Sequence, residues 1–506
     1  MSIENENNKK ATDSEQTEGP DKLENLGKNE RLFLEKAKEA AKFFKGIDKH
    51  KTVRVVSHLD ADGISAAAIL IKMLNRTNRR YSISIVQQLN EEKIKSLKKE
   101  RYGVFVFTDI GSGQIRHIAN HLSDRKVLVL DHHKPEKEFF KWNVSDNIFQ
   151  YNPHLTDIDG NDNISGSGVV YLFSREVAKK NLDMAHIAIV GAMGDMQEDY
   201  GFKPLNNLIL QAAIETKKMK IINGVRIFGA QTRPLYKLLQ YSTDPYIPGV
   251  TGSESGAIDF LHKIGINPKN KDGGWTKLIE LDDNDMKKLV AGIIMLRMNG
   301  SVEDAQKIVG PVYLLKDEKK ASPLKDAKEF ATLLNACGRL NMASLGIGTC
   351  LGDPLTKRKA LNALKDYKKE IVGALKWYEN NQKNKRLVHN DEGFIIINSK
   401  EEIRSSIIGT MCSIITKSNK EENLKFIMGM ARNDDEDTTK VSMRTTLQNG
   451  IDLSEIIARI CDGIDAEVGG HKHAAGALIK SEDEPKVIEN AKRVLSKIAI
   501  EEKMEI

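Results

Sequence analysis

Two apolar segments, residues 52–57 and 126–130, are each followed directly by carboxylate and imidazole side chains. Both segments have the composition of buried parallel strands, and ligands collect at the carboxyl ends of such strands. Carboxylates packed closely together repel and raise one another's pKa, a penalty that divalent cations remove. The pattern therefore predicts a metal-dependent site for cleaving phosphoesters. The side chains concerned are His58, Asp60 and Asp62 after the first segment and Asp131, His132 and His133 after the second.

Two more aspartates continue this pattern. Asp109 closely follows the apolar residues 104–107, and Asp195 closely follows residues 187–190. One such aspartate alone would indicate a helix cap, but four segments together favour a metal centre. Carboxylate oxygens mixed with a few imidazoles suit manganese or magnesium, and the histidines favour manganese.

The elements around these residues alternate between strands and helices, which predicts an α/β fold with a parallel sheet. A mostly helical section follows, and then strands return in a second, smaller α/β domain. The first domain has expected strands at 52–57, 81–86, 103–108 and 126–130 and expected helices at 31–46, 63–74, 168–180 and 184–193. Later elements are a helix at 358–380 and strands at 393–398, 425–430 and 440–444.

The domain divisions follow from the same changes in pattern. The first thirty residues have no aromatic and few aliphatic side chains, so we expect a disordered tail. The expected units are the tail at 1–30, a catalytic domain at 31–254, a helical connecting section at 255–386 and a substrate-binding domain at 387–506.

Composition limits the class of protein. The chain has 506 residues, 40% of them hydrophobic and 29% charged, which is typical of a globular protein. No apolar run approaches the ~18 residues that span a bilayer, and the amino terminus lacks the apolar core of a signal peptide. We therefore expect a cytoplasmic protein with no membrane partner. The tail has a net charge of −4, which leaves +10 for the remainder, a mild basic excess compatible with a polyanionic partner. The four cysteines show no metal-site spacing and are expected to be reduced, mostly buried thiols.

The order of the motifs resembles that of the DHH phosphoesterase superfamily. His-x-Asp-x-Asp-Gly at 58–63 precedes the isolated Asp109, Asp-His-His at 131–133 and Gly-Asp at 194–195. Gly-Gly-His-x-x-Ala-Ala-Gly at 469–476 is similar to the signature of the accompanying DHHA1 domain.

The resemblance covers roughly residues 50–250 and 387–500, and the chain looks most like archaeal RecJ-type single-strand nucleases. It implies a centre of two ions, manganese or magnesium, with Asp109 as the bridge. It also implies that Asp131 is a ligand or a support for one, and that His133 contacts the scissile phosphate. The implied ligands are His58, Asp60, Asp62, Asp109, His132 and Asp195.

The second motif has its own physical logic for binding substrate. The adjacent Gly469 and Gly470 let a phosphate approach the backbone, and the small residues after them suit a helix start. His471 can donate to a phosphate oxygen, and Arg444 can grip one with two hydrogen bonds. Arg444 lies in Ser-Met-Arg, which resembles the family strand that pairs with this loop.

Arg339 is a weaker candidate. It could face the substrate, but a helix end capped at Gly338 explains the residues 335–339 about as well.

The resemblance implies an exonuclease that acts on single-stranded DNA or RNA in repair or replication. An oligoribonuclease or a small-nucleotide phosphodiesterase is the alternative within the enzymes. A catalytically inactive scaffold subunit, associated with GINS-type replication proteins, is the alternative outside them. Such scaffolds lack several metal ligands, whereas this sequence has all of them, so we favour catalysis.

Overall fold

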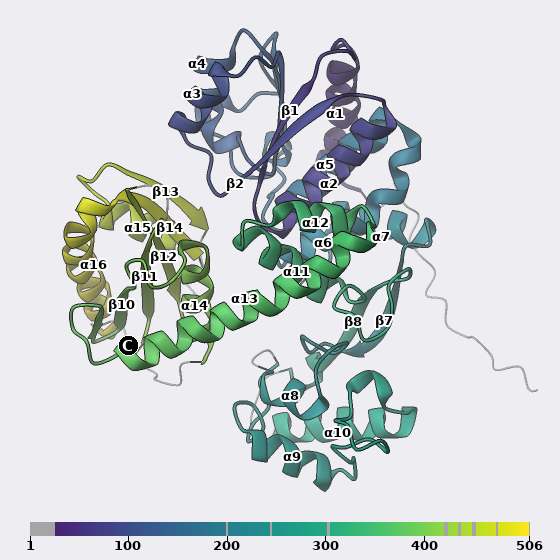
Figure 1. The fold of residues 1–506 in the computed structure, drawn as a ribbon, viewed down its shortest axis with the longest axis vertical. Helices are drawn as coiled ribbons and strands as arrows, with labels where there is room; N and C mark the ends of the chain where they lie inside the picture. The colour runs from purple at the N-terminus through teal and green to yellow at the C-terminus, as the bar shows by residue number, and fades with distance from the viewer. Residues whose placement is uncertain are drawn as a thin grey trace, which may run out of the picture.

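The computed structural model describes residues 26–198, 201–242, 245–300, 304–418, 424–433, 437–447, 452–471 and 474–504. Figure 1 shows two sheet-containing domains, with a helical body beside them and the long helix α13 between them. The expected fold class, a parallel-sheet domain, a helical middle part and a second smaller α/β domain, is confirmed. Most of the expected tail lies outside the described residues, but residues 28–30 already belong to the first helix.

The first domain is built on a six-stranded sheet in the order β2-β1-β3-β4-β6-β5, parallel except for the edge strand β5. The chain leaves β1 for β2 and then crosses back to β3, so the strand order reverses between β1 and β3. The four predicted strands are confirmed, and the short β5 and β6 were not predicted. The strands are β1 (Val53–His58), β2 (Tyr81–Val86), β3 (Val104–Thr108), β4 (Lys126–Leu130), β5 (Asn143–Ser145) and β6 (Ile148–Tyr151).

Helices cover both faces of this sheet, because successive side chains of a strand point to opposite sides. Val55 and Val106 pack into a core that includes α1, α2, α5 and α6. Phe105 and Val129 pack into another core with α3 and α4. The helices are α1 (Lys28–Lys45), α2 (Ala61–Arg76), α3 (Glu91–Lys99), α4 (Ile115–Leu122), α5 (Gly166–Val177), α6 (Ala185–Gly194) and α7 (Pro204–Glu215).

A small helical body is connected to the first domain by an antiparallel ribbon of two strands, β7 and β8. It has its own apolar core, to which Leu238, Leu261 and Ile293 contribute. The sequence-based division between residues 254 and 255 passes through this body. Its elements are β7 (Met219–Val225), α8 (Leu235–Gln240), α9 (Glu254–Lys263), α10 (Asp283–Asn299) and β8 (Val309–Leu315).

Three further helices link the two sheet-containing domains: α11 (Ala327–Arg339), α12 (Ala343–Cys350) and α13 (Pro354–Asn381). The first two pack against α2, and α13 continues to the second domain, where it contacts α14. In the part of the chain that the structure describes, no helix is long and apolar enough to cross a membrane.

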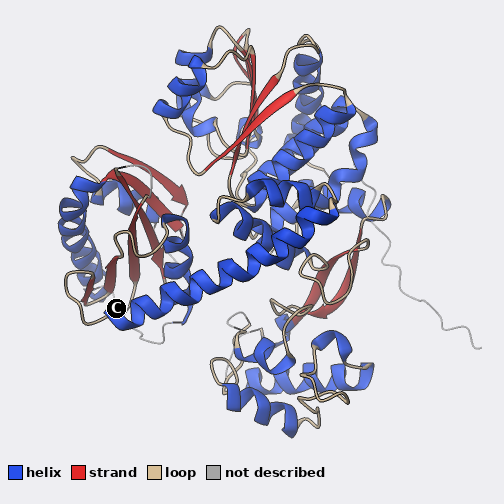
Figure 2. Cartoon of the chain, viewed as in Figure 1, coloured by secondary structure: helices blue, strands red, loops and turns tan. Residues whose placement is uncertain are grey.

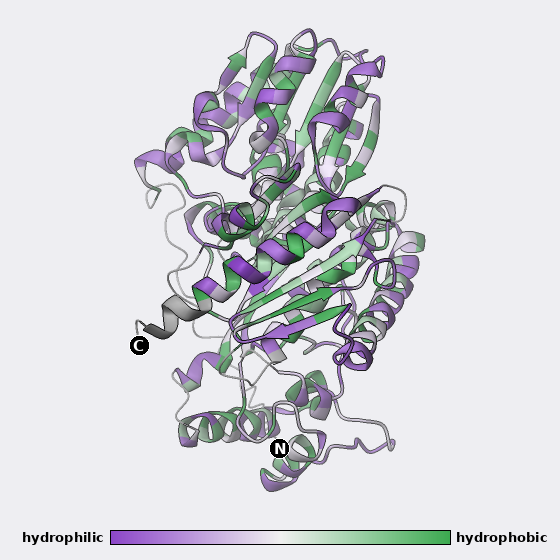
Figure 3. Cartoon of the chain, turned by 90° about the vertical axis from the view of Figure 1, so that its left-hand side faces the viewer, coloured by the Kyte–Doolittle hydropathy of each residue, from purple (hydrophilic) through white to green (hydrophobic). Residues whose placement is uncertain are grey.

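The second domain contains a mixed six-stranded sheet in the order β13-β14-β12-β11-β10-β9. Helices α15 and α16 pack on one face, and α14 packs on the other. Figure 3 shows mostly hydrophobic strands, whereas α16, which leads to the C terminus, alternates between hydrophobic and hydrophilic residues. The elements are β9 (Val388–Asp391), β10 (Phe394–Asn398), α14 (Ser405–Ser418), β11 (Phe426–Arg432), β12 (Thr438–Thr445), α15 (Leu453–Ile460), β13 (Ala466–His471), β14 (Ala474–Lys480) and α16 (Glu484–Met504).

Figure 2 shows that strands are concentrated in the two sheets and the ribbon, while helices dominate the middle of the chain. All four cysteines are buried and free, as the sequence predicted: Cys337, Cys350, Cys412 and Cys461.

Candidate metal centre

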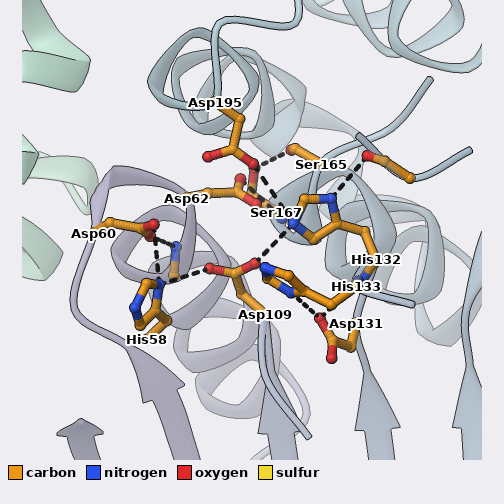
Figure 4. A network of polar contacts seen from close by, with 12 residues as sticks. His58, Asp60, Asp62, Asp109, Asp131, His132, His133, Ser165, Ser167 and Asp195 are labelled. Atoms are coloured by element: carbon orange, nitrogen blue, oxygen red, sulfur yellow. Dashed lines mark hydrogen bonds and ion pairs between the residues drawn. The ribbon is translucent and has the colours of Figure 1, made fainter. Parts of the chain in front are cut away.

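Six side chains converge at the carboxyl ends of β1, β3 and β4, next to the reversal point of the first sheet (Figure 4). Open α/β sheets bind ligands at such a reversal point. Asp195, the residue that follows the last residue of helix α6, completes the group from above. We call this group the cup: His58, Asp60, Asp62, Asp109, His132 and Asp195. The structure therefore brings together all six side chains that the resemblance implied as metal ligands.

One side of the cup is formed by His58, Asp60 and Asp109. The Nδ1 atom of His58 lies 2.9 Å from Oδ2 of Asp60 and 3.6 Å from Oδ2 of Asp109. Neither contact has hydrogen-bond geometry, since Nδ1 has no hydrogen-bond partner in the described structure. Asp60 also caps α2 by accepting a hydrogen bond from the backbone N of Gly63. The backbone thus fixes this carboxylate at a helix N-terminus, where negative charge is favoured.

The other side is formed by Asp62, His132 and Asp195. The Nε2 atom of His132 lies 3.3 Å from Oδ1 of Asp109 and 3.5 Å from Oδ2 of Asp195. Its Nδ1 lies 2.8 Å from the carbonyl oxygen of Gly160. A carbonyl can only accept, so Nδ1 donates to it and Nε2 is the nitrogen that faces the cup. Burial alone would lower the pKa of His132, but Asp109 and Asp195 outweigh it and raise that pKa well above its usual value, so Nε2 must lose a proton to bind a metal.

Asp109 lies between the two sides. It is 1% exposed, and neither of its carboxylate oxygens has a hydrogen-bond partner among the described residues. Oδ2 of Asp62 is also buried without one. Buried carboxylate oxygens without partners are costly, and a cation satisfies them. The oxygen-rich donor set, with two imidazoles, fits manganese or magnesium.

The electrostatics of the cup show an excess of buried negative charge. Burial, and next the Asp109 carboxylate, raise the pKa of Asp62 to about 7. Burial and Asp62 raise the pKa of Asp195 well above its usual value. Burial alone would lower the pKa of His58, but Asp60 and Asp109 outweigh it and raise that pKa. Protons thus compensate the charge that a divalent cation would otherwise neutralise.

Asp131 supports its neighbours. Its Oδ1 accepts hydrogen bonds from the backbone N of His132 and from Nδ1 of His133, the latter at 2.8 Å. Its Oδ2 accepts from the backbone N of Ser112 at 2.8 Å. With both oxygens engaged, Asp131 fits the supporting role better than the ligand role, two alternatives that the sequence left open. It holds the His133 ring at the edge of the cup.

Glycines allow the cup to close this tightly. A Cβ atom on Gly166 would lie 2.5 Å from Oδ1 of Asp109, and one on Gly191 would lie 2.4 Å from Oδ1 of Asp62. Ser167 adds a backbone N–H that donates to this Asp62 oxygen at 3.1 Å. The sequence predicted a helix start at Gly-Ser-Gly 166–168, which α5 confirms, but not that these residues support the carboxylates of the cup.

A cationic cluster of Arg339, Lys440 and Arg444 lies at the junction of the two domains. Burial, together with Arg339 and Arg444, lowers the pKa of Lys440 to about 8. Burial and Arg339 also lower the pKa of Arg444. Neighbouring cations repel one another, and an anion that binds between them removes this unfavourable energy. Lys440 was not predicted, but its place four residues before Arg444 on β12 puts both on one face of the strand.

Arg339 connects this cluster to the cup. The neighbouring Gly338 packs so closely on the loop between His58 and Asp60 that a Cβ atom would lie 1.7 Å from the carbonyl oxygen of Leu59. The alternative of a helix capped at Gly338 is therefore wrong, because α11 continues through this glycine to Arg339. Close packing, and not a left-handed cap, is the reason for glycine here.

The expected helix after the Gly-Gly-His motif is also wrong. Gly469, Gly470 and His471 lie at the end of β13, which pairs antiparallel with β14. Gly470 has a φ of 137° and lies against the backbone of Ala475, so only glycine fits there without strain. Both glycines are exposed. Arg444 pairs with Ala474 on β14, the strand that follows the loop.

Comparison with known families agrees with this architecture. The chain matches the N-terminal domain of the DHH family at residues 52–193, the DHH-CID domain at 227–309 and the DHHA1 domain at 392–497. The DHH-CID match covers most of the small helical body.

Solved structures share the fold. RecJ of Thermus thermophilus in complex with Mn²⁺ superposes with a TM-score of 0.55 at 16% identity, over 91% of this chain and 55% of that one. The chain thus spans about half the length of that protein. An exonuclease RecJ bound to manganese gives 0.52 at 16% identity, over 91% and 94% of the two chains. CDC45 of Entamoeba histolytica gives 0.59 at 12% identity, over 92% and 98%.

An uncharacterized protein of Methanocaldococcus jannaschii is 33% identical over 477 residues, which cover 91% of this chain and 98% of that protein. A similarity of this extent goes beyond a shared fold. The chain therefore belongs to the DHH phosphoesterase family and carries its N-terminal, DHH-CID and DHHA1 domains.

Proposed function

We propose that the protein is a metal-dependent phosphodiesterase that removes nucleotides from an end of single-stranded DNA or RNA. The observation that carries this proposal is the complete cup, in which Oδ2 of Asp62 and both carboxylate oxygens of Asp109 lack hydrogen-bond partners among the described residues. A catalytically inactive scaffold would have no need to maintain these costly carboxylates.

Two divalent ions would be held on the two sides of the cup and share Asp109. His58 and Asp60 would complete one side, and a second set would complete the other: Asp62, His132 and Asp195. A pair of ions supplies Lewis acidity and charge stabilisation for an in-line displacement at phosphorus. The protein itself orients the groups that contact the substrate. Asp131 accepts a hydrogen bond from His133, and the His133 ring can then contact a phosphate oxygen.

The cationic cluster supports a polyanionic substrate. Arg339 lies next to Gly338, which contacts the loop of the cup. Lys440 and Arg444, on β12 of the second domain, lie near Arg339. A phosphate next to the scissile one can therefore be bound by cations of the second domain. Arginine suits this role because its planar guanidinium can donate two hydrogen bonds to one phosphate.

A single strand fits this arrangement better than a duplex. The strand would lie between the cup of one domain and the cations of the other, while a duplex must first be unpaired at a cost of about 1.4 kcal/mol per base-pair step. The two RecJ structures support nuclease activity, since one of them is named as an exonuclease bound to manganese. Roles in DNA repair or replication, and GINS-type partners, belong to this proposal.

The direct test is a time course with Mn²⁺ on DNA and RNA oligonucleotides, each labelled at either end, beside a circular single strand. We expect mononucleotides to accumulate from one end of linear strands, with no cleavage of the circle. Products from the circle would overturn the end-dependent model. Cleavage of di- and trinucleotides alone would favour an oligoribonuclease or small-nucleotide phosphodiesterase. Tight binding without cleavage would favour a scaffold, and CDC45 shows that this fold occurs outside RecJ proteins.

A further inference from the structure

A second group of metal-type ligands lies outside the cup, on the α3 and α4 face of the first sheet. It consists of Glu91, His117 and His121. The two histidines are four residues apart on α4, so their rings lie one turn apart on the same helix face. Glu91 is the first residue of α3, which packs beside α4.

The distances match those of a metal site. Nε2 of His121 lies 2.9 Å from Oε1 of Glu91, and Nδ1 of His117 lies 3.7 Å from Oε2 of the same residue. The three ligand atoms all lie within 4.8 Å of one another. Ligands held about 2.0–2.1 Å from a tetrahedral ion are about 3.3–3.5 Å apart. Small side-chain rotations would therefore bring these atoms to coordinating positions.

A helix cap and a shared apolar core hold the two helices of this site in place. Asn90 caps α3 by accepting a hydrogen bond from the backbone N of Lys93 at 2.8 Å. Ile94 of α3 and Ile118 of α4 are fully buried in a shared core, which fixes the helices relative to each other. The ligand side chains remain accessible, at 41% exposure for Glu91, 37% for His117 and 22% for His121.

We propose that Glu91, His117 and His121 bind one transition-metal ion of the Zn²⁺ or Ni²⁺ type, independently of the cup. Two imidazoles and one carboxylate favour these ions, whereas the oxygen-rich cup favours manganese or magnesium. The two sites would therefore sort metals by ligand type. Water can complete the coordination, since the site is partly exposed.

The site lies at the junction with the second domain. Nε2 of Gln88 donates to Oε2 of Glu467 on β13 at 3.2 Å. Burial raises the pKa of Glu467, and His117 is close enough to this carboxyl to oppose that shift. β13 leads directly into Gly469 and Gly470. An ion bound at this site would place positive charge beside an acidic residue of the strand that carries the substrate-binding loop.

Two interactions within the group compete with an ion. Nε2 of His121 donates a hydrogen bond to Oε1 of Glu91, so His121 must give up that proton to bind a metal. Nζ of Lys95 lies 2.9 Å from Oε1 of Glu91, the oxygen that also contacts His121. An ion must displace this ammonium group. His121 and Lys95 hold the pKa of Glu91 at about 2, so the carboxylate is ionised at neutral pH. Replacing Lys95 should therefore strengthen metal binding, while a purely ion-paired cluster would bind no metal in either form.

The test measures bound metal and needs no enzymatic activity. Full-length protein carrying Asp109→Asn, which disables the cup, is stripped with a chelator and dialysed against Zn²⁺ or Ni²⁺, and metal per chain is determined by mass spectrometry. We expect one ion, its loss on adding His117→Gln and His121→Gln, and its retention with His262→Gln, an exposed histidine of α9. Lys95→Gln should lower the Zn²⁺ concentration needed for half-occupancy.

Cobalt gives an independent readout, because tetrahedral Co²⁺ absorbs visible light far more strongly than hydrated Co²⁺. That absorption should appear in the Asp109→Asn protein and vanish with either histidine substitution. Circular dichroism checks that each variant is folded. Equal metal content with and without the two histidines, or loss of the ion in the His262→Gln protein, would overturn the proposal.

Discussion

The cup and the cationic cluster are built in different ways. All six side chains of the cup belong to the first domain, and strand ends, a helix N-terminus and close glycine contacts fix them in place. The cationic cluster instead joins Arg339 of α11 to Lys440 and Arg444 of the second domain. The cup is therefore complete within one domain, whereas the cluster exists only when the two domains are held together.

This difference suggests a division of labour. Metal binding should depend on residues of the first domain alone, because all six ligands of the cup come from it. Strand binding should depend on both domains. The following predictions test whether metal binding and strand binding depend on different residues.

The largest effect is expected from Asp109→Asn. Asparagine keeps the size of the side chain and tolerates the φ of 58° at this position, so the fold should survive. The amide is a poor substitute for a bridging carboxylate. Turnover with Mn²⁺ should fall on the order of 1,000-fold or more, beyond the roughly 10–100-fold typical of residues that only support ligands. Near-normal turnover at saturating Mn²⁺ would show that Asp109 is not a ligand.

Arg444→Ala should weaken binding of the strand and leave Mn²⁺ affinity unchanged. Loss of one charge-assisted hydrogen bond costs about 1.5–3 kcal/mol. We expect the same direction for His471→Ala on the basis of the family motif. Calorimetry of Mn²⁺ and fluorescence anisotropy of a labelled strand measure the two affinities separately. Arg459→Ala, on the exposed side of α15, is the matched control. If Arg444→Ala lowered the affinity for Mn²⁺ and left the affinity for the strand intact, the proposed division between metal binding and strand binding would be wrong.

Gly338→Ala tests the packing that connects the two regions. The added Cβ would lie 1.7 Å from the carbonyl oxygen of Leu59, so α11 must move away from the cup. Such overpacking costs about 1–3 kcal/mol of unfolding free energy. Gly373→Ala on α13 has nothing within 4 Å of the new Cβ and should be neutral or slightly stabilising. Urea denaturation compares the two, and equal stability would mean that the contact with Leu59 is not tight.

The two regions should also respond to pH in opposite directions. Asp62, with a pKa of about 7, must lose its proton to bind a metal. Asp195 and His58, whose pKa values are also raised, must do the same, so Mn²⁺ affinity should rise with pH through 7. Lys440, with a pKa of about 8, loses its charge above that value, so strand affinity should fall as pH rises through 8. The alkaline limb, which depends on one lysine, should change by about tenfold per pH unit at most. The acidic limb should be steeper, because more than one ligand loses a proton when the metal binds.

Single variants identify the source of each limb. Lys440→Arg should move the alkaline limb to higher pH, because arginine stays charged. Asp62→Asn should make the acidic limb of the metal titration less steep and should lower the Mn²⁺ affinity at every pH. An alkaline limb that is unchanged in the Lys440→Arg protein would assign it to another group.

Sequence predicted the first domain well because strong local signals coincide there. The strands at 104–108 and 126–130 are nearly continuous apolar runs, and the strand at 53–58 has valine at half of its positions. Ligands stand at the end of each strand or directly after it. A parallel sheet then brings strand ends together regardless of the length of the connections. This is why His58, Asp109 and His132, which follow three different strands, could be assigned to one site. Asp195 follows a helix, so its assignment depended on the order of the motifs.

The remaining features depended on contacts that no local pattern reveals. Gly338 looked like a helix cap because a glycine near a helix end often is one, but here the cause is the backbone of Leu59. The segment after Gly470 looked like a helix start because it is rich in alanine, yet pairing with β12 makes it a strand. The role of Lys440 was hidden because only the folded sheet brings it near Arg339.

The most direct test of the cup is anomalous diffraction from crystals grown with Mn²⁺. We expect two manganese peaks about 3.5–4 Å apart, one on each side of Asp109. His58 and Asp60 should contact one peak, and Asp62, His132 and Asp195 should contact the other. A single peak, or peaks away from Asp109, would contradict the account.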